Sequence, residues 1–395
     1  MTRVFFWAAA ASLTYSYFLF PAMVFMRAVL RPRPHQQANI TPSVTVVIAA
    51  RNEVRHIGRK LESLRRQDYP TEQLQIVIVS DGSDDGTSAV VENFGMHNAR
   101  VLDLPRVGKA EALRAGAAVA IGEIIVFSDA NSICASDAIS WLVRSFQDPA
   151  VGGVAGNQVY LSGGEEDATA YGERSYWDLD RALKLAQSRA GNVISATGAL
   201  YAIRRQLFRP IPPGVTDDMF LSLSVIDAGY RLVFEPAALV YETVAPSRSV
   251  EYGRKVRIMT RGLRCVATVP RVLDPRRSGF YAVQLFSHKV LRRLMAVPLL
   301  VLGLTSLRLT SRGPVYRLSA TIQLAFYLMA VLGLGLSRRR AGRTPFFALP
   351  AYFCLVQAAS LHATWNLLRG RLYDRWEPAR DQALSGAFQP SGERT

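Results

Sequence analysis

Apolar residues in this 395-residue chain gather toward its two ends, in runs that suit a lipid bilayer. The first run extends from Val4 to Met26. The later runs cover residues 294–309, 315–336 and 345–368, and the first of these three is short. Between the two groups lies a stretch with the mixed composition of a soluble domain. The pattern predicts an N-terminal transmembrane helix at 1–30, a soluble domain at 41–270 and about three transmembrane helices at 294–368.

Basic residues beside these runs give the chain a net charge of +16 and indicate its orientation. Arg3 alone precedes the first run, whereas Arg31 and Arg33 follow it, so the positive-inside rule places the soluble domain in the cytoplasm. A cleaved signal peptide is the competing interpretation, although its apolar stretch would be shorter and its following flank less basic. The basic cluster at 337–343 is also expected on the cytoplasmic side, while the side of the polar tail, residues 369–395, stays open.

Residues 278–293 have a different pattern, in which apolar and basic side chains share one helical stretch. The apolar positions include Phe280, Val283, Phe286 and Val290 and alternate with basic ones: His288, Lys289, Arg292 and Arg293. This pattern is typical of an amphipathic helix in the membrane interface. The chain has no helix-turn-helix, zinc-finger or RNA-binding motif, so its positive charge indicates a membrane and anionic ligands rather than nucleic acid.

Short β-branched runs alternate with helical patterns in the first part of the soluble stretch. Strands are predicted at 44–49, 75–79, 101–102 and 124–128. One helix is predicted to begin with Asn52 as its cap, and another to cover 108–120. This alternation predicts an α/β domain with a mostly parallel sheet and helices on both faces. Polar loops follow three of the strands, at 51–53, 80–87 and 129–131, and such loops meet at the carboxyl edge of the sheet. No Gly-x-Gly-x-x-Gly or phosphate-binding loop occurs, which argues against a dinucleotide oxidoreductase or a P-loop ATPase.

The segments at this edge resemble the membrane-bound glycosyltransferases of family 2, the group that includes the polysaccharide and poly-N-acetylglucosamine synthases. Six matching segments occur in the family's order within 41–264: 46–53, 79–87, 108–110, 127–131, 196–202 and 215–218. Each is weak alone, and the ordered set is specific. The resemblance implies a GT-A type nucleotide-sugar-binding domain with a mostly parallel central sheet, flanked by transmembrane helices.

The resemblance assigns the nucleotide to the first two loops. Asp81 matches the aspartate that accepts a hydrogen bond from the donor's base, and a cap on the next helix is its alternative role. Arg51 and Glu53 would border the nucleotide, and a surface ion pair is the alternative for these two. Asp84 and Asp85 suit a helix entrance better than a ligand.

Lys109 and the segment 129–131 are expected near the donor's phosphates. A lysine at a helix start attracts anions, although an ordinary exposed lysine is the alternative. Asp129 and Asn131 match the family's metal-binding Asp-x-Asp, with a neutral amide in place of the second carboxylate. A hard divalent ion, Mg²⁺ or Mn²⁺, is expected here and would bridge the diphosphate. A plain turn after the strand is the competing role.

Residues 216–218 match the family's Thr-Glu-Asp motif, with Asp218 as the general base that takes the proton of the acceptor hydroxyl. Adjacent carboxylates on a helix point about 100° apart, so only one of Asp217 and Asp218 faces the sugar. Helix capping is the alternative for Asp217. The resemblance places Gly198, Tyr201 and Asp217 in the pocket for donor or acceptor sugar.

The stretch after the base departs from the family's pattern. Processive members carry Gln-x-x-Arg-Trp, whereas this chain has Arg254 and Ile258 in place of the Gln and the Trp and retains Arg257. Arg257 would clamp the diphosphate, and attraction to the membrane surface is a second role open to this stretch. Because the Trp helps to line the acceptor site in the family, its replacement weakens the expectation of a long polymer.

Together these patterns predict an inverting, metal-dependent glycosyltransferase in the bacterial plasma membrane, with a cytoplasmic catalytic domain. Its expected partners are a nucleotide sugar, UDP-linked at the level of the family, and a growing extracellular or cell-wall glycan. Two alternatives stay open: single-sugar transfer to a membrane lipid or polyprenyl phosphate, and an inactive scaffold that binds nucleotide sugars.

Overall fold

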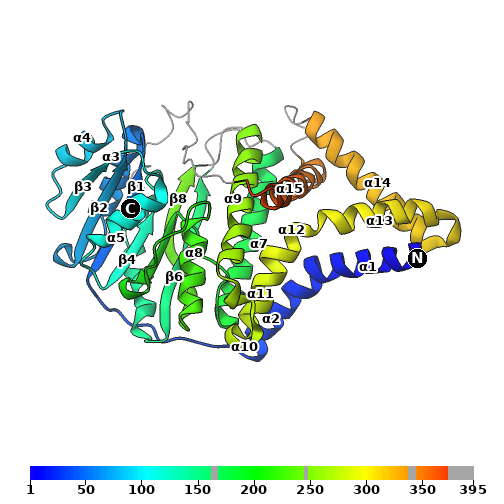
Figure 1. The fold of residues 1–395 in the computed structure, drawn as a ribbon, viewed down its shortest axis with the longest axis horizontal. Helices are drawn as coiled ribbons and strands as arrows, with labels where there is room; N and C mark the ends of the chain where they lie inside the picture. The colour runs from blue at the N-terminus through cyan, green and yellow to red at the C-terminus, as the bar shows by residue number, and fades with distance from the viewer. Residues whose placement is uncertain (162–167, 244–247, 337–343, 372–395) are drawn as a thin grey trace, which may run out of the picture.

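The computed structural model describes residues 1–161, 168–243, 248–336 and 344–371. The basic cluster at 337–343 and most of the tail at 369–395 therefore lie outside the described residues. Figure 1 shows a domain built on a β-sheet at one end of the molecule and long apolar helices at the other. Three helices stand between these parts: α7 (Ala168–Ala190), α9 (Arg248–Thr268) and α15 (Pro345–Leu368).

The described residues form one eight-stranded sheet in the order β3-β2-β1-β4-β7-β6-β8-β5. The strands are β1 (Val44–Ala50), β2 (Leu74–Asp81), β3 (Ala99–Leu104), β4 (Ile124–Ser128), β5 (Ile133–Cys134), β6 (Val151–Leu161), β7 (Leu200–Arg204) and β8 (Arg231–Thr243). The first four strands pair in parallel, as do β6 and β8. β7 runs antiparallel to both β4 and β6 and joins these two blocks. The predicted mostly parallel sheet is confirmed.

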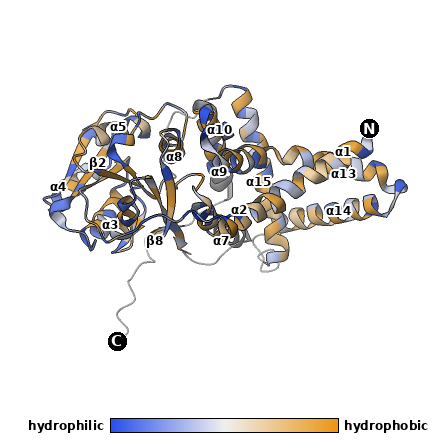
Figure 2. Cartoon of the chain, turned by 90° about the horizontal axis from the view of Figure 1, so that it is seen from below, coloured by the Kyte–Doolittle hydropathy of each residue, from blue (hydrophilic) through white to orange (hydrophobic). Residues whose placement is uncertain are grey.

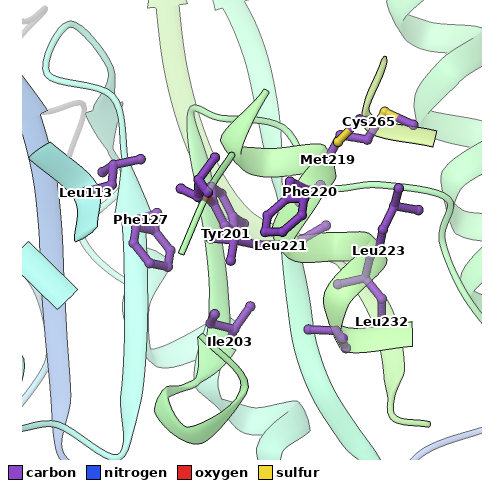
Figure 3. Packing of buried hydrophobic residues seen from close by; sticks show 14 of the residues in the cluster. Leu113, Phe127, Tyr201, Ile203, Met219, Phe220, Leu221, Leu223, Leu232 and Cys265 are labelled. Atoms are coloured by element: carbon purple, nitrogen blue, oxygen red, sulfur yellow. The ribbon is translucent and has the colours of Figure 1, made fainter. Parts of the chain in front are cut away.

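Both faces of the sheet are buried, which explains the continuous apolar runs in its strands. Along β1, Val47 and Ala49 contribute to one core while Val46 and Ile48 contribute to the other. The first core lies beneath α5 (Lys109–Ala118) and α8 (Asp217–Asp227), and part of it is drawn in Figure 3. The second lies beneath α3 (Val54–Arg65) and α6 (Ala138–Val143). These cores fix the strand ends from which the polar loops emerge.

The apolar ends of the chain form helices, as predicted. The first consists of α1 (Thr2–Thr14), a π-helical turn (Tyr15–Leu19) and α2 (Phe20–Leu30), and the later ones are α13 (Ala296–Leu309), α14 (Pro314–Gly335) and α15. Within the described residues, three helices are long and apolar enough to cross a membrane, or four if a bent pair counts as one span. Figure 2 shows the apolar residues on the α1, α13 and α14 surfaces.

The predicted interfacial segment, 278–293, is helical but interrupted. It contains the end of α10 (Pro275–Ser278), then α11 (Phe280–Leu285), a π-helical turn (Phe286–Leu291) and the start of α12 (Arg292–Leu294), and it bends by 51° into α13. The Tyr281 hydroxyl donates a hydrogen bond to the Ile194 carbonyl at 2.7 Å. Phe286 is 48% exposed, on the predicted apolar face. One face thus docks on the sheet domain while apolar residues of the other remain exposed.

We predict that Gly116→Ala destabilises the domain, because a Cβ at Gly116 would lie 2.5 Å from Val47 Cγ1 on β1. Overpacking of this kind costs about 1–3 kcal/mol, which exceeds the gain in helix propensity. Gly253→Ala is the matched control, since Gly253 is also helical and has open space at its Cβ. Thermal unfolding of the detergent-solubilised chain should show a lower midpoint for Gly116→Ala alone. Equal midpoints would contradict the close packing of α5 on β1.

Candidate active site

The polar loops that follow β1 and β2 are joined by direct hydrogen bonds. Asn52 N–H donates to Ser83 Oγ at 3.1 Å, and Asp84 N–H donates to Asn52 Oδ1 at 3.0 Å. Asn52 has a left-handed φ of 54° and precedes the helix, so its predicted role as a helix cap is wrong. Asp85 takes that role through its carboxylate, which accepts the N–H of Val54 in α3 and of Thr87 in α4 (Thr87–Asn93). The predicted helix-entry role of Asp85 is confirmed.

Asp81 is fully buried at the end of β2. Its Oδ1 accepts the backbone N–H groups of Val107 at 2.6 Å and Gly108 at 2.9 Å, which fixes the loop before α5. The carboxylate therefore does not cap the helix that follows β2, which was its alternative role. Its Oδ2 is buried without a hydrogen-bond partner in the described part of the chain. Such an acceptor is costly to leave unpaired, which suits a ligand N–H at this position.

Arg51 and Glu53 occupy the first loop but do not form the ion pair considered for them. The Glu53 carboxylate lies 2.8 Å from His56 Nδ1, within the start of α3. Its backbone N–H donates to Thr87 Oγ1 at 2.9 Å, so Glu53 also ties the first loop to α4. Arg51 is half-buried at the end of β1. A nucleotide contact for these two residues stays a prediction.

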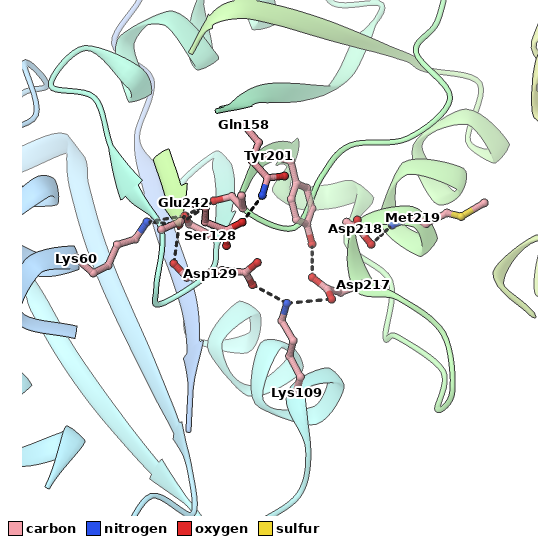
Figure 4. A network of polar contacts seen from close by, with 12 residues as sticks. Lys60, Lys109, Ser128, Asp129, Gln158, Tyr201, Asp217, Asp218, Met219 and Glu242 are labelled. Atoms are coloured by element: carbon pink, nitrogen blue, oxygen red, sulfur yellow. Dashed lines mark hydrogen bonds and ion pairs between the residues drawn. The ribbon is translucent and has the colours of Figure 1, made fainter. Parts of the chain in front are cut away.

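Lys109 lies at the centre of the polar network drawn in Figure 4. Its ammonium is 2.8 Å from Asp129 Oδ1 and 3.2 Å from Asp217 Oδ1, and the side chain is only 16% exposed. Burial lowers the pKa of Lys109, but the two carboxylates outweigh burial and raise this pKa above its usual value. The alternative of an ordinary exposed lysine is therefore wrong. Lys109 joins the predicted donor-side carboxylate to the predicted sugar pocket.

Gly198 and Tyr201 lie at the Asp129–Lys109–Asp217 network, and their place in a sugar pocket stays a prediction. A Cβ at Gly198 would lie 3.2 Å from Asp129 Oδ2 and 3.8 Å from Lys109 Nζ, so a larger residue here would press on the Asp129 carboxylate. The buried Tyr201 hydroxyl donates to Asp217 Oδ2 at 3.2 Å. Burial and the Asp217 charge raise the pKa of Tyr201 well above its usual value, so the phenol keeps its proton.

Asp217 and Asp218 begin α8, directly after Thr216 at the N-cap. Asp217 does not cap the helix, since its carboxylate contacts Lys109 and Tyr201. Burial would raise the pKa of Asp217, but Lys109 and Arg261 lower it below the usual value. Burial and the Asp217 charge raise the pKa of Asp218 instead. The two adjacent carboxylates thus have opposite shifts, which is typical of a pair with separate roles.

The donor set at Asp129 suits a hard cation that arrives with further oxygens. Asp129 Oδ1 contacts Lys109, while Oδ2 accepts no hydrogen bond within the described residues and lies toward the Gly198 backbone. Asn131 is exposed on the same loop. In the part of the chain that the structure describes, no three His, Cys, Asp or Glu side chains form a metal cluster. Mg²⁺ binds through one or two carboxylates plus substrate phosphates, and the residues present fit that mode.

Three polar residues at the site were not identified from the sequence. Lys60, fully buried on α3, donates to Ser128 Oγ at 2.6 Å and to Ser132 Oγ at 3.1 Å, which braces the Asp129 loop. Arg261 on α9 donates to the Val215 carbonyl at 2.9 Å. It lies one helical turn after Arg257, whose contact with a diphosphate stays a prediction.

The third residue is Glu242, near the end of β8. Burial and the charge of Asp129 raise the pKa of Glu242 to about 7, and Arg254 opposes this shift. The Gln158 amide donates a hydrogen bond to Glu242 Oε2. The rule that ligands bind at strand ends would have pointed to Glu242, but no motif marked it.

We predict that Lys109→Met destabilises the protein, because it leaves the Asp129 and Asp217 carboxylates without their shared cation. Removing one partner of a buried ion pair costs about 3–5 kcal/mol, which corresponds to a melting temperature roughly 6–15 °C lower. The double variant Lys109→Met/Asp129→Asn should recover part of this loss, since it removes one uncompensated charge. If Lys109→Met melts at the wild-type temperature, the ammonium does not hold the site together.

Comparisons with known proteins agree with this geometry. The model of "Glycosyltransferase like family 2" matches residues 42–264. An N-acetylglucosaminyltransferase of Rhizobium meliloti is 30% identical over 294 residues, which cover 69% of this chain and 67% of that protein. A poly-beta-1,6-N-acetyl-D-glucosamine synthase of Staphylococcus epidermidis is 25% identical over 251 residues, covering 61% and 59%. Among such curated relatives, the chain spans from 52% of one rhizobial N-acetylglucosaminyltransferase to 77% of that of Sinorhizobium fredii.

A solved structure resembles nearly the whole chain. The mannosyltransferase PcManGT from Pyrobaculum calidifontis, in complex with GDP-Man and Mn²⁺, is 25% identical. It aligns with a TM-score of 0.68 over 92% of this chain and 99% of its own. The family match covers more than half of the 395 residues, and the fold of the sheet domain follows it. The chain belongs to glycosyltransferase family 2, and its sheet domain has the GT-A fold.

Proposed function

We propose that this chain is an inverting, metal-dependent glycosyltransferase that moves a sugar from a UDP-sugar to a growing extracellular or cell-wall glycan. The observation that carries the proposal is the Lys109 bridge between Asp129 and Asp217, with Asp218 next in the chain. It joins a candidate donor carboxylate, Asp129, to the residue that directly precedes the candidate catalytic base. Relatives named N-acetylglucosaminyltransferase and poly-N-acetylglucosamine synthase support N-acetylglucosamine as the sugar.

The donor half of the proposed site consists of Asp81, Lys109 and Asp129. The unpaired Asp81 Oδ2 would accept an N–H of the nucleobase. A divalent ion bound at Asp129 together with the diphosphate would stabilise the negative charge on the leaving group. Lys109 adds a fixed positive charge beside the same phosphates, at the N-terminus of α5. The complex of PcManGT with GDP-Man and Mn²⁺ supports a nucleotide sugar and a divalent metal as ligands of this chain.

The acceptor half depends on Asp218. As the acceptor oxygen attacks the anomeric carbon, its proton passes to the Asp218 carboxylate while the bond to the diphosphate breaks on the opposite face, which inverts the configuration. A raised pKa makes Asp218 a stronger base than an ordinary aspartate. Lys109 keeps Asp217 ionised, and the Asp217 charge contributes to that raised pKa. One lysine thus serves both halves of the reaction.

The apolar helices support a membrane location with the sheet domain on the cytoplasmic side, where nucleotide sugars are made available. They would receive the acceptor next to Asp218, since α8 packs against α9 and α9 packs against α15. Single-sugar transfer to a lipid or polyprenyl phosphate is the second candidate. It is favoured by Arg254 and Ile258, which replace the Gln and the Trp of processive synthases.

We predict that membranes containing the chain release a nucleoside diphosphate from one member of a panel of UDP- and GDP-sugars with Mg²⁺ or Mn²⁺. Asp218→Asn should lower this rate by about 10²–10⁴-fold, because it removes the base and keeps the shape of the side chain. Asp227→Asn is the control on the same helix, since Asp227 pairs with Arg209 away from the network. Product partition separates the candidates: polymer stays in the aqueous, high-mass fraction, whereas a glycosylated lipid enters organic solvent.

Two results would contradict the proposal. Nucleotide binding without release from any donor, in the wild type as well as in Asp218→Asn, would favour the scaffold. Release that persists in Asp218→Asn would assign the base elsewhere.

We also predict that the acid limb of the pH profile of kcat/KM lies above about pH 4, which is where an ordinary aspartate titrates. Activity should rise as pH increases through the Asp218 pKa, because the base must lose its proton. Burial and Asp217 raise this pKa, while the Met219 N–H, Lys109 and Thr216 lower it. Asp217→Asn removes the neighbouring charge and should move the limb to lower pH. A limb that stays in place would mean that Asp218 is not the titrating base.

A further inference from the structure

The loop that would hold the metal carries one charge fewer than its family pattern. Asn131 stands where the family has a second aspartate, and its amide oxygen ligates without charge. One oxygen of Asp129 is engaged by Lys109. A divalent ion therefore receives little negative charge from this loop, unless another element supplies it.

The sheet brings β8 to this loop. β5 begins at Ile133, directly after the loop, and pairs antiparallel with β8 so that Ile133 faces Tyr241 and Cys134 faces Val240. Continuing this register places Glu242 opposite Ser132, one residue from Asn131. Antiparallel neighbours hold their Cβ atoms about 4.5–5.5 Å apart, so Glu242 reaches the same small region as the loop.

The Glu242 side chain is held in a defined position. On the other edge of β8, β6 pairs in parallel and places Gln158 opposite Val240. The Gln158 amide donates to Glu242 Oε2, and its Nε2 also lies 3.0 Å from the Tyr160 hydroxyl. Figure 4 shows this amide and the carboxylate on the Asp129 side of the network. An amide that orients a carboxylate through one oxygen leaves the other for a cation, as around metal ligands.

The charges around Glu242 are also those of an incomplete cation site. The Asp129 and Glu242 carboxylates belong to the one polar network drawn in Figure 4, and the cations near Glu242 are Arg254 and Lys109. Burying two like charges is costly unless a cation lies between them. Lys109 forms its two ion pairs with Asp129 and Asp217, so a divalent ion of the donor complex would add positive charge on the side of Glu242, beside Arg254.

We propose that Glu242 is a ligand of the donor-bound divalent ion and supplies the charge that Asn131 lacks, with Gln158 as its positioning residue. The inference rests on the proposed function, since the ion would arrive with the nucleotide diphosphate. The metal site is then divided between two strand ends, Asp129 after β4 and Glu242 in β8. The competing role is purely structural, in which the Gln158–Glu242 hydrogen bond only joins β6 to β8.

The test measures Mn²⁺ binding to the purified full-length chain in the presence of saturating UDP or GDP. The EPR signal of free Mn²⁺ reports how much of the ion is bound. Glu242→Gln keeps the shape and the hydrogen-bonding capacity but loses the charge, and should weaken Mn²⁺ binding by at least about 10-fold. Glu242→Gln/Asn131→Asp should restore it to within about 3-fold, because the second carboxylate returns to the loop. Asn131→Asp alone should tighten Mn²⁺ binding, which keeps the test valid if Glu242→Gln fails to fold.

The matched control is Glu235→Gln, on the same strand. Glu235 is buried and accepts hydrogen bonds from Gln37 and from the Ala237 N–H, away from the network, so its substitution should leave Mn²⁺ affinity unchanged. Glu242→Gln with Mn²⁺ affinity within 2-fold of the wild type, or a double variant without recovery, would overturn the assignment. A wild type that binds no Mn²⁺ with either nucleotide would instead contradict the metal dependence in the proposed function, and the assignment would fall with it.

Discussion

The ion bridge from Lys109 to Asp129 and Asp217 is the interaction on which the site depends. Its three members come from α5, from the loop after β4 and from α8, and they meet only when the sheet and the helices on one of its faces are in place. Without the lysine, the half-buried Asp129 and the buried Asp217 would lose the cation that they share. The bridge therefore links fold stability to the proposed chemistry, since it also keeps Asp217 ionised beside Asp218.

Two helices beside the site, α9 and α11, connect the sheet domain to the apolar helices. Arg261 on α9 holds the Val215 carbonyl just before Asp217, and Tyr281 on α11 bonds to the Ile194 carbonyl. α9 packs in turn against α15, one of the helices long enough to span a membrane. Under the proposed function, this packing places the helix that carries Asp218 close to the helices that would meet an acceptor in the membrane. It also explains why the segment at 278–293 has one face docked on protein and another with exposed apolar residues.

Much of this arrangement was predictable, because it follows from local patterns. The β-branched runs and their spacing predicted the strands, and the rule for strand ends predicted that the loops at Asp81 and Asp129 meet. The family motifs selected Lys109, Gly198, Tyr201 and Asp217, and the structure brings these residues together.

What the sequence did not predict depends on contacts between distant segments. Asparagine is a common residue at helix caps, yet Asp85 from the next loop caps α3 in place of Asn52. Glu242 carries no motif, and only the pairing of β8 with β5 places it beside the Asn131 loop.

The most direct test of the central claim is a cryo-EM structure of the full chain with Mn²⁺ and UDP. We expect the diphosphate at Lys109 and Asp129, with an open path from its outer phosphate to Asp218. A nucleotide bound elsewhere, or an Asp218 carboxylate turned away from it, would contradict the account.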